Sequence, residues 1–160
     1  MKVLTKLSFA CLLITAFTFS ATGQTKKYKC LLQMSNYIGE GAYVIVSLVN
    51  PQDAYEKTLY VMGADKKWYK SIDEWYKFYA KKPANLSAVT GASVTGGDRS
   101  INVIEIENSK INTGYKLRFE TAVEGKKYYL KDVEIPLTTA ALSMKSEGTG
   151  YIRYVRLIPN

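Results

Sequence analysis

The segment from residue 115 to residue 123 constrains the fold more than any other part of this chain. Its odd-numbered positions carry apolar or small side chains, and charged residues stand between them at 116, 118 and 120. Such alternation is typical of a β-strand with one face in a core and the other in water. The side chains that we expect to face the core are those of Tyr115, Leu117, Phe119, Thr121 and Val123.

Other short segments have the composition of strands and are separated by turn residues. They cover residues 29–34, 42–49, 57–62, 101–107, 128–137 and 150–158. The run from Tyr43 to Val49 is apolar on both faces, which predicts a central strand covered on each side. A change of phase between Val103 and Ile104 predicts a β-bulge. Together these segments predict a single antiparallel β-sandwich of the immunoglobulin-like type.

One helix is expected near residues 71–80. Ser71 and Glu74 have the spacing of a capping box, and Lys81-Lys82-Pro83 closes the far end. Ile72, Trp75, Phe78 and Tyr79 fall on one face of this segment. Two interpretations of that aromatic face remain open: it packs on the sheet, or one or two of its rings also flank a planar ligand.

The N-terminus has the pattern of a secretory signal peptide. Two lysines precede an apolar run at residues 7–19, and small residues follow at 20–23. We expect cleavage after Gly23, which leaves one domain at residues 24–160 in the periplasm or otherwise outside the cytoplasm. The apolar run is too short to span a bilayer, so no stable membrane insertion is expected.

Charge and cysteine content limit the function classes. Residues 24–160 hold 20 basic and 14 acidic residues, a net charge of +6. Export argues against a nucleic-acid partner, and the scattered lysines and arginines indicate solvated strand faces with a modest attraction for phosphate. Cys30 is the single cysteine of this part. It has no disulfide partner within the chain, and burial in the first strand is favoured over a reactive role.

The chain lacks the usual catalytic residues. It contains no histidine, which excludes triads and metal sites built on imidazole. One remaining thiol cannot form a multi-cysteine zinc site, and no glycine-rich phosphate loop precedes a helix. The sequence predicts neither catalytic nor metal-binding residues, and it favours a redox carrier or accessory domain over a stand-alone enzyme.

The segment from residue 86 to residue 97 is rich in glycine and hydroxyl groups. Within it, Thr90-Gly91-Ala92-Ser93 presents the Ser93 hydroxyl beside two very small residues. Such a loop is easily drawn into the active site of another protein. We therefore interpret Ser93 as a candidate modification site.

Several segments of the chain resemble an exported bacterial family known as domain of unknown function 2271, and the resemblance extends from about residue 27 to residue 137. They are Tyr43-Val44-Ile45-Val46, the run from Lys57 to Gly63, Lys67-Trp68-Tyr69, Glu74-Trp75-Tyr76 and the run from Ala88 to Ser93. The resemblance implies an extracytoplasmic electron-transfer protein that accompanies membrane proteins of the PepSY type. The last run also resembles the flavinylation motif of covalent FMN-binding domains.

Carried over to this chain, the motif makes Ser93 the acceptor of FMN through a phosphoester. Thr90, Gly91 and Ala92 become the sequence that an FMN transferase recognises when it uses FAD and a divalent metal. Ser87 stands where the motif usually has aspartate, which is a departure from the pattern.

Proximity to Ser93 in the sequence suggests which side chains contact the flavin. Trp68 or Trp75 is expected to stack on the ring system. Arg99 and either Lys66 or Lys67 are expected to stabilise the charge of the reduced form.

A second function of a different class explains the same strands and charge. The protein is then a non-catalytic exported binding or accessory β-sandwich without a cofactor. In that interpretation, residues 86–97 are only a surface loop.

Overall fold

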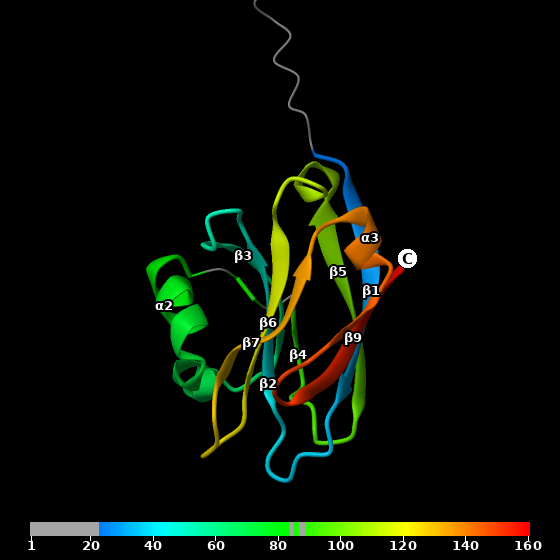
Figure 1. The fold of residues 1–160 in the computed structure, drawn as a ribbon. Helices are drawn as coiled ribbons and strands as arrows, with labels where there is room; N and C mark the ends of the chain where they lie inside the picture. The colour runs from blue at the N-terminus through cyan, green and yellow to red at the C-terminus, as the bar shows by residue number, and fades with distance from the viewer. Residues whose placement is uncertain (1–22, 84, 87–88) are drawn as a thin grey trace, which may run out of the picture.

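The computed structural model describes residues 23–83, 85–86 and 89–160 (Figure 1). Apart from Gly23, the predicted signal peptide lies outside the described residues, and so does Ser87. The strands are β1 (Thr25–Met34), β2 (Tyr43–Val49), β3 (Tyr55–Met62), β4 (Thr90–Gly91), β5 (Arg99–Glu107), β6 (Lys116–Ala122), β7 (Tyr129–Pro136), β8 (Lys145–Glu147) and β9 (Ile152–Pro159). The helices are the 3-10 helices η1 (Lys66–Ser71) and η2 (Asn108–Lys110) and the α-helices α2 (Asp73–Lys81) and α3 (Thr139–Leu142).

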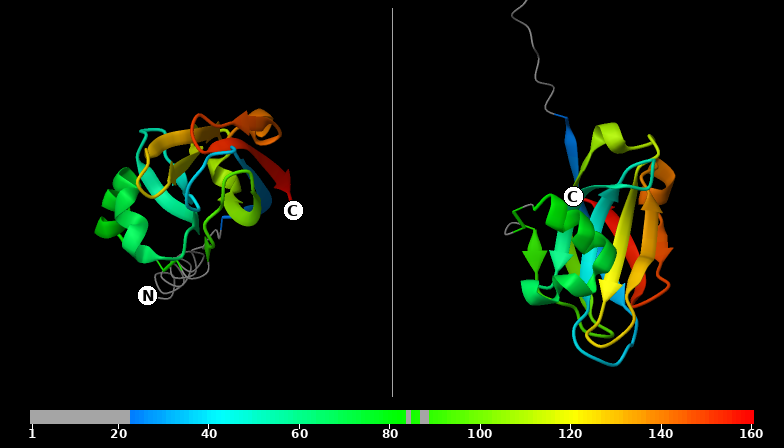
Figure 2. Two further views of the ribbon diagram at one scale, coloured as in Figure 1. Left: turned by 90° about the horizontal axis from the view of Figure 1, so that it is seen from below. Right: turned by 90° about the vertical axis from the view of Figure 1, so that its left-hand side faces the viewer.

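Two sheets form the body of the molecule, as the views in Figure 2 show. One has the order β5-β1-β9-β8 and the other the order β4-β3-β2-β6-β7. Neighbouring strands are antiparallel except for the short parallel pair β3–β4. All seven predicted strands are present, and the antiparallel β-sandwich is confirmed. As predicted, β2 is an interior strand that is buried on both faces.

The main core lies between the two sheets. Its members are the inward-facing side chains of all the long strands, among them Leu32, Val46, Phe119, Ile135 and Val155, which are almost inaccessible to solvent. Cys30 belongs to this core, and burial raises the pKa of its thiol to about 12. The prediction of a buried cysteine in the first strand is therefore confirmed, and an unreactive thiol is expected at neutral pH.

A second, smaller core lies on the outer face of the five-stranded sheet. Helices η1 and α2 cover this face (Figure 1) and bring Tyr69, Ile72 and Trp75 against Ile45 and Val61. The Trp75 and Tyr79 rings stack with their centroids 5.0 Å apart. The aromatic face of the helix thus packs on the sheet.

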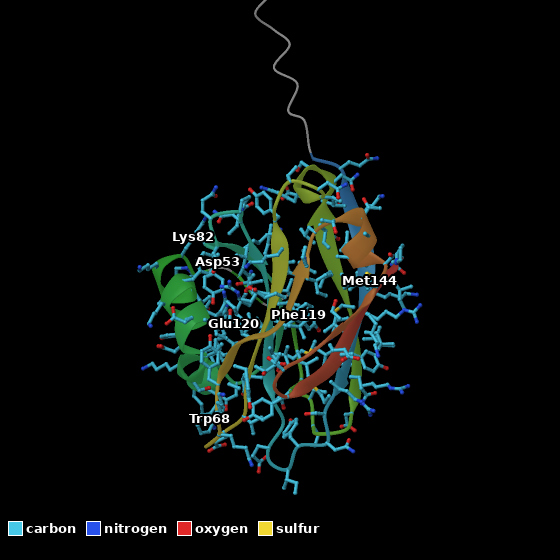
Figure 3. All side chains as sticks on the ribbon, in the orientation of Figure 1. Asp53, Trp68, Lys82, Phe119, Glu120 and Met144 are labelled. Atoms are coloured by element: carbon cyan, nitrogen blue, oxygen red, sulfur yellow. The ribbon has the colours of Figure 1, made fainter. Side chains whose placement is uncertain are left out.

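This second core corrects the prediction for β6. The alternation is real, but the charged face of the strand is also buried, since Arg118 is 3% exposed and Glu120 is fully buried. Figure 3 shows consecutive residues on opposite faces, with Phe119 between the sheets and Glu120 toward α2. The strand is covered on both sides because the η1–α2 segment packs over the face that would otherwise meet water.

The predicted capping box is wrong. Helix α2 begins at Asp73, its N-cap residue Ile72 makes no side-chain cap, and the Ser71 hydroxyl donates to the Trp68 carbonyl oxygen at 2.6 Å. Ser71 ends η1, so it cannot also cap α2. Glu74 instead accepts a hydrogen bond from Lys77 on the surface of the helix.

The predicted bulge in β5 is also wrong. The strand pairs with β1 in unbroken register from Arg99 to Glu107. Ile104 faces the core, whereas Ile101 and Val103 lie on the outer face and are 62% and 47% exposed. The apparent change of phase arises because apolar side chains occupy both faces of an edge strand.

No helix in the described part of the chain is long and apolar enough to cross a membrane.

Candidate functional site

The segment that carries Ser93 is anchored along the edge of the five-stranded sheet. The main-chain N–H of Val61 donates to the Val89 carbonyl oxygen and that of Gly63 to the Gly91 carbonyl oxygen, each at 2.8 Å. The Thr90 hydroxyl donates to the Leu86 carbonyl oxygen at 2.7 Å. These contacts hold the two residues at the start of the motif as strand β4.

A second anchor follows directly after Ser93. Ala42 and Val94 exchange main-chain hydrogen bonds of 2.7 and 3.1 Å. The Tyr37 hydroxyl donates to the Val94 carbonyl oxygen at 2.6 Å and accepts from the Ala42 N–H at 2.8 Å. Ser93 lies between the two anchors and is exposed, so its side chain is open to solvent on a main chain that is held on both sides.

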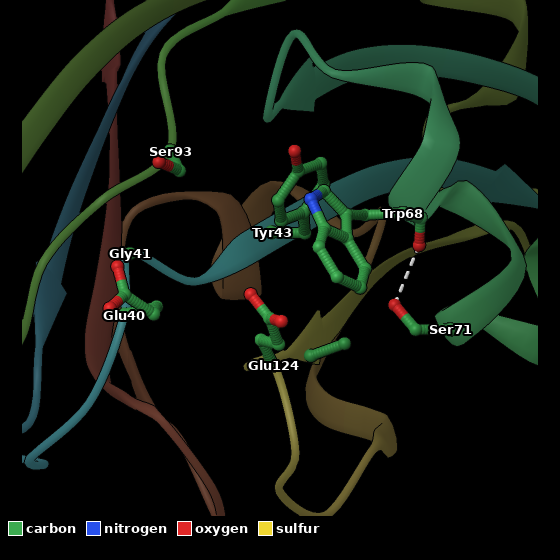
Figure 4. Close-up of a pocket in the computed structure, with 8 residues that line it drawn as sticks. Glu40, Gly41, Tyr43, Trp68, Ser71, Ser93 and Glu124 are labelled. Carbon is green, nitrogen blue, oxygen red and sulfur yellow. Dashed lines mark hydrogen bonds between the residues drawn. The ribbon is translucent and has the colours of Figure 1, made fainter.

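Ser93 lines a surface hollow of about 160 Å³. Figure 4 shows Ser93 and Gly41 on one side of this hollow and Trp68 and Ser71 on the other. The complete lining comprises Glu40, Gly41, Tyr43, Trp68, Ser71, Ser93, Ala122 and Glu124. Enclosed sites for drug-sized ligands usually measure roughly 300–1,000 Å³. A three-ring molecule held here would therefore be only partly covered.

Two glycines allow the close contacts of this wall. A Cβ atom at Gly41 would lie 2.5 Å from the Ser93 Oγ. Gly63 has a φ of +126°, and a Cβ there would lie 2.1 Å from the Tyr43 ring. Gly63 is required both for space and for its left-handed backbone conformation, whereas a side chain at Gly41 would displace the Ser93 hydroxyl.

Two carboxylates line the hollow, and a lysine lies beside its tryptophan. Glu40 and Glu124 supply carboxylates, while the Lys67 ammonium lies 5.2 Å above the Trp68 ring and 2.8 Å from the Asp65 carboxylate. The hydrogen bond from Lys67 lowers the pKa of Asp65. Burial raises the pKa of Tyr43, whose hydroxyl donates to the Asp65 carbonyl oxygen at 3.2 Å. Tyr43 therefore stays a neutral ring at physiological pH.

The structure brings together Ser93 and Trp68 among the residues suggested by the sequence, and Lys67 contacts the tryptophan. Trp75 does not line the hollow. It is fully buried on the side of α2 that faces the sheet, and its Nε1 donates to the Thr58 Oγ1 at 2.9 Å. Arg99 lies on β5 in the other sheet, where its Nε donates to the Gln33 Oε1 at 2.5 Å.

Sequence reasoning missed six of the eight lining residues. They come from the segment before β2, from β2, from the end of η1, from the end of β6 and from the hairpin after it, and they are Glu40, Gly41, Tyr43, Ser71, Ala122 and Glu124. No sequence spacing connects them, because the sandwich alone brings these segments together. Among the described residues, no group of three or more cysteine, aspartate or glutamate side chains is arranged to hold a metal ion.

The fold and this site define a small β-sandwich with an exposed, anchored serine beside an aromatic hollow. Comparison with protein families then places the chain: the model described as "Predicted periplasmic protein (DUF2271)" matches residues 25–154. The chain belongs to this family of predicted periplasmic proteins, in agreement with the family and the extracytoplasmic location expected from the sequence. No curated protein and no solved structure matches the chain significantly.

Proposed function

We propose that the protein is an exported redox carrier that holds FMN covalently on Ser93. The observation that carries the proposal is the position of the Ser93 hydroxyl, exposed and anchored on the rim of the hollow that Trp68 and Tyr43 line. A covalent link suits a protein outside the cytoplasm, where a dissociated flavin would be lost. The flavin supplies the redox chemistry, and the chain supplies its attachment and surroundings.

The attachment step is a phosphoryl transfer from FAD that a separate transferase catalyses with a divalent metal. The Ser93 Oγ attacks the phosphorus of the FMN half of FAD, and the phosphoanhydride bond to AMP breaks. AMP leaves, the hydroxyl proton passes to a base of the transferase or to water, and a phosphoester remains on Ser93. This reaction needs an acceptor that can enter a foreign active site, which an exposed residue on a sheet edge satisfies.

The surroundings of Ser93 suggest how the attached flavin would lie. Glu40 and Glu124 repel the phosphate, which therefore stays on the outer side of the hollow. The ring system then reaches toward Trp68 across the opening, where an aromatic face and the adjacent Lys67 ammonium are available. The open hollow would leave one edge of the flavin accessible to a redox partner. The partner expected from the family is a membrane reductase of the PepSY type.

A second function, a binding or accessory domain without a cofactor, is favoured by two observations. The hollow carries two carboxylates, and Ser87 replaces the aspartate that usually begins the flavinylation motif. The carboxylates disfavour an anionic ligand, and the serine at position 87 disfavours recognition of the motif by a transferase. This alternative predicts that the purified protein is colourless and has its unmodified mass.

The deciding experiment is co-expression of the full chain with an FMN transferase, followed by mass spectrometry of the exported protein. We expect a mass increase equal to FMN less one water and a flavin absorbance spectrum. Ser93→Ala should abolish both, Ser93→Thr should retain them because it keeps a hydroxyl, and Thr95→Ala should leave them unchanged. Unmodified wild-type protein in the presence of an active transferase would overturn the carrier function.

A further inference from the structure

Strand β5 leaves one side of the four-stranded sheet unpaired. It is the first strand in the order β5-β1-β9-β8, and no described strand bonds to its other side. Its hydrogen bonds with β1 include Met34 N–H to Asp98 C=O and Asn108 N–H to Gln24 C=O, and the register between them is unbroken. Even-numbered residues of β5 therefore bond to β1, and the main-chain groups of odd-numbered residues point away from the sheet.

This edge has little of the usual protection against association. Exposed edge strands are commonly blunted by a bulge, a proline or charged side chains, above all lysine. The strand Arg99–Glu107 has no bulge, and its sequence contains neither proline nor lysine; its charged residues are Arg99, Glu105 and Glu107. Ile101 and Val103 on its outer face are among the most exposed large apolar side chains of the described part of the chain. The edge is thus long, regular and partly apolar.

The outward-facing side chains of β5 are complementary to themselves. In an antiparallel alignment of two copies centred on Asn102, Arg99 lies opposite the partner subunit's Glu105, and Ile101 lies opposite the partner subunit's Val103. Each pair occurs twice because the arrangement is two-fold symmetric. Directly opposite residues on one face of antiparallel strands attract when their charges are opposite or when both are apolar.

We propose that β5 pairs with β5 of a second copy of this chain and joins the two four-stranded sheets into one continuous sheet. The odd-numbered residues supply the main-chain donors and acceptors of this interface. The alignment centred on Asn102 places these residues opposite one another, as such hydrogen bonds require. Glu105 already contacts Lys27 at 3.3 Å, but both side chains are more than half exposed. Such a contact is weak, and it leaves the carboxylate available to an arginine.

The alignment centred on Val103 fits less well. It retains an opposite-charge pair between Arg99 and the partner subunit's Glu107, but it places Ile101 against the partner subunit's Glu105. An apolar side chain opposite a carboxylate loses the favourable contact on both symmetric sides. The register centred on Asn102 is therefore the one that the interface uses.

The test is sedimentation of the mature chain, residues 24–160, over a range of concentrations at low salt. We expect a reversible monomer–dimer equilibrium. Arg99→Glu and Glu105→Arg should each weaken dimerisation by about tenfold or more, because each replaces two attractive pairs with two repulsive ones. An equimolar mixture of these two variants should recover the dimer, as should the double variant, since opposite charges again face each other.

Two further variants separate strand pairing from other modes of association. Ile101→Lys should give a monomer. Ile158→Lys should keep the dimer, because Ile158 is exposed on the same face but on the interior strand β9. A wild-type protein that stays monomeric at all concentrations, or a charge-reversed mixture that fails to dimerise, would overturn the proposal. Circular dichroism confirms that each variant is folded. Ser93→Ala should leave the equilibrium unchanged, since the interface does not involve the proposed flavin.

Discussion

The Tyr128 hydroxyl donates a hydrogen bond to the Glu120 carboxylate between the five-stranded sheet and helix α2. Burial raises the pKa of Glu120 to about 7, although this hydrogen bond and the nearby Arg118 charge act in the opposite direction. Glu120 thus lies fully buried on the face of the sheet that α2 covers.

Glu120 should make the stability of the protein depend on pH. A carboxyl group in an unfolded chain has a pKa of about 4.3, and here the folded-state pKa is raised to about 7. The folded state therefore loses stability as the pH rises from about 4 to 7, at up to about 1.4 kcal/mol per pH unit, and the loss is complete above that range. We expect Glu120→Gln to be more stable than the wild type by about 2–3 kcal/mol at pH 8 and by much less at pH 4.

Urea unfolding followed by tryptophan fluorescence at several pH values measures this difference. Glu147→Gln is a suitable control, because that side chain is 75% exposed and its removal should change little at any pH. An identical difference between Glu120→Gln and the wild type at pH 4 and pH 8 would contradict the prediction.

Asp132 is a second buried carboxylate with a structural role. It is 1% exposed and accepts hydrogen bonds from the Thr121 hydroxyl and from the main-chain N–H groups of Thr149, Gly150 and Ile152 at 2.6–3.0 Å. Asp132→Asn places an amide donor against these donors, and we expect a loss of about 3 kcal/mol in the free energy of unfolding. Asp73→Asn, which removes an exposed ion pair with Lys77, should cost less than about 1 kcal/mol. Equal effects of the two variants in urea unfolding would contradict the structural role of Asp132.

Gly41 should control access to the Ser93 hydroxyl. The Cβ of Gly41→Ala would lie 2.5 Å from the Ser93 Oγ, so the serine must move or rotate. We expect the co-expressed variant to carry severalfold less FMN than the wild type while its melting temperature falls only slightly, because Ser93 is exposed and can shift. Mass spectrometry of the intact protein gives the modified fraction. Wild-type levels of modification in Gly41→Ala would show that the hydroxyl does not need its present position.

The two tryptophans should respond differently to the attached flavin. Trp68 lines the hollow, whereas Trp75 is buried under α2. A stacked tryptophan quenches flavin fluorescence, so Trp68→Ala should raise the emission of the bound flavin severalfold without preventing its attachment. Trp75→Phe should leave the emission unchanged and destabilise the fold instead, since the Thr58 hydroxyl loses its indole partner. An increase in flavin emission in Trp75→Phe and none in Trp68→Ala would contradict the prediction that Trp68 stacks on the flavin.

Local patterns predicted most of the secondary structure. The alternation in β6 and the apolar run of β2 depend on neighbouring residues, and the structure confirms both. Gly125, with a φ of +66°, lies in the turn of the hairpin that joins β6 to β7. The prediction of a bulge in β5 was wrong because the exposed Ile101 and Val103 give the appearance of a change of phase. A sequence does not show which strand lies at the edge of a sheet.

The sequence by itself determined the seven longer strands, the single long helix, the buried cysteine and the family, because each of these depends on composition or on local spacing. Tertiary structure alone decided that Glu120 is buried, that Glu74 does not complete a cap, and that Trp68 rather than Trp75 shares a hollow with Ser93. The physical reason is that η1 and α2 pack over the outer face of the five-stranded sheet. That packing is a contact between segments far apart in the chain, and no periodicity within either segment encodes it.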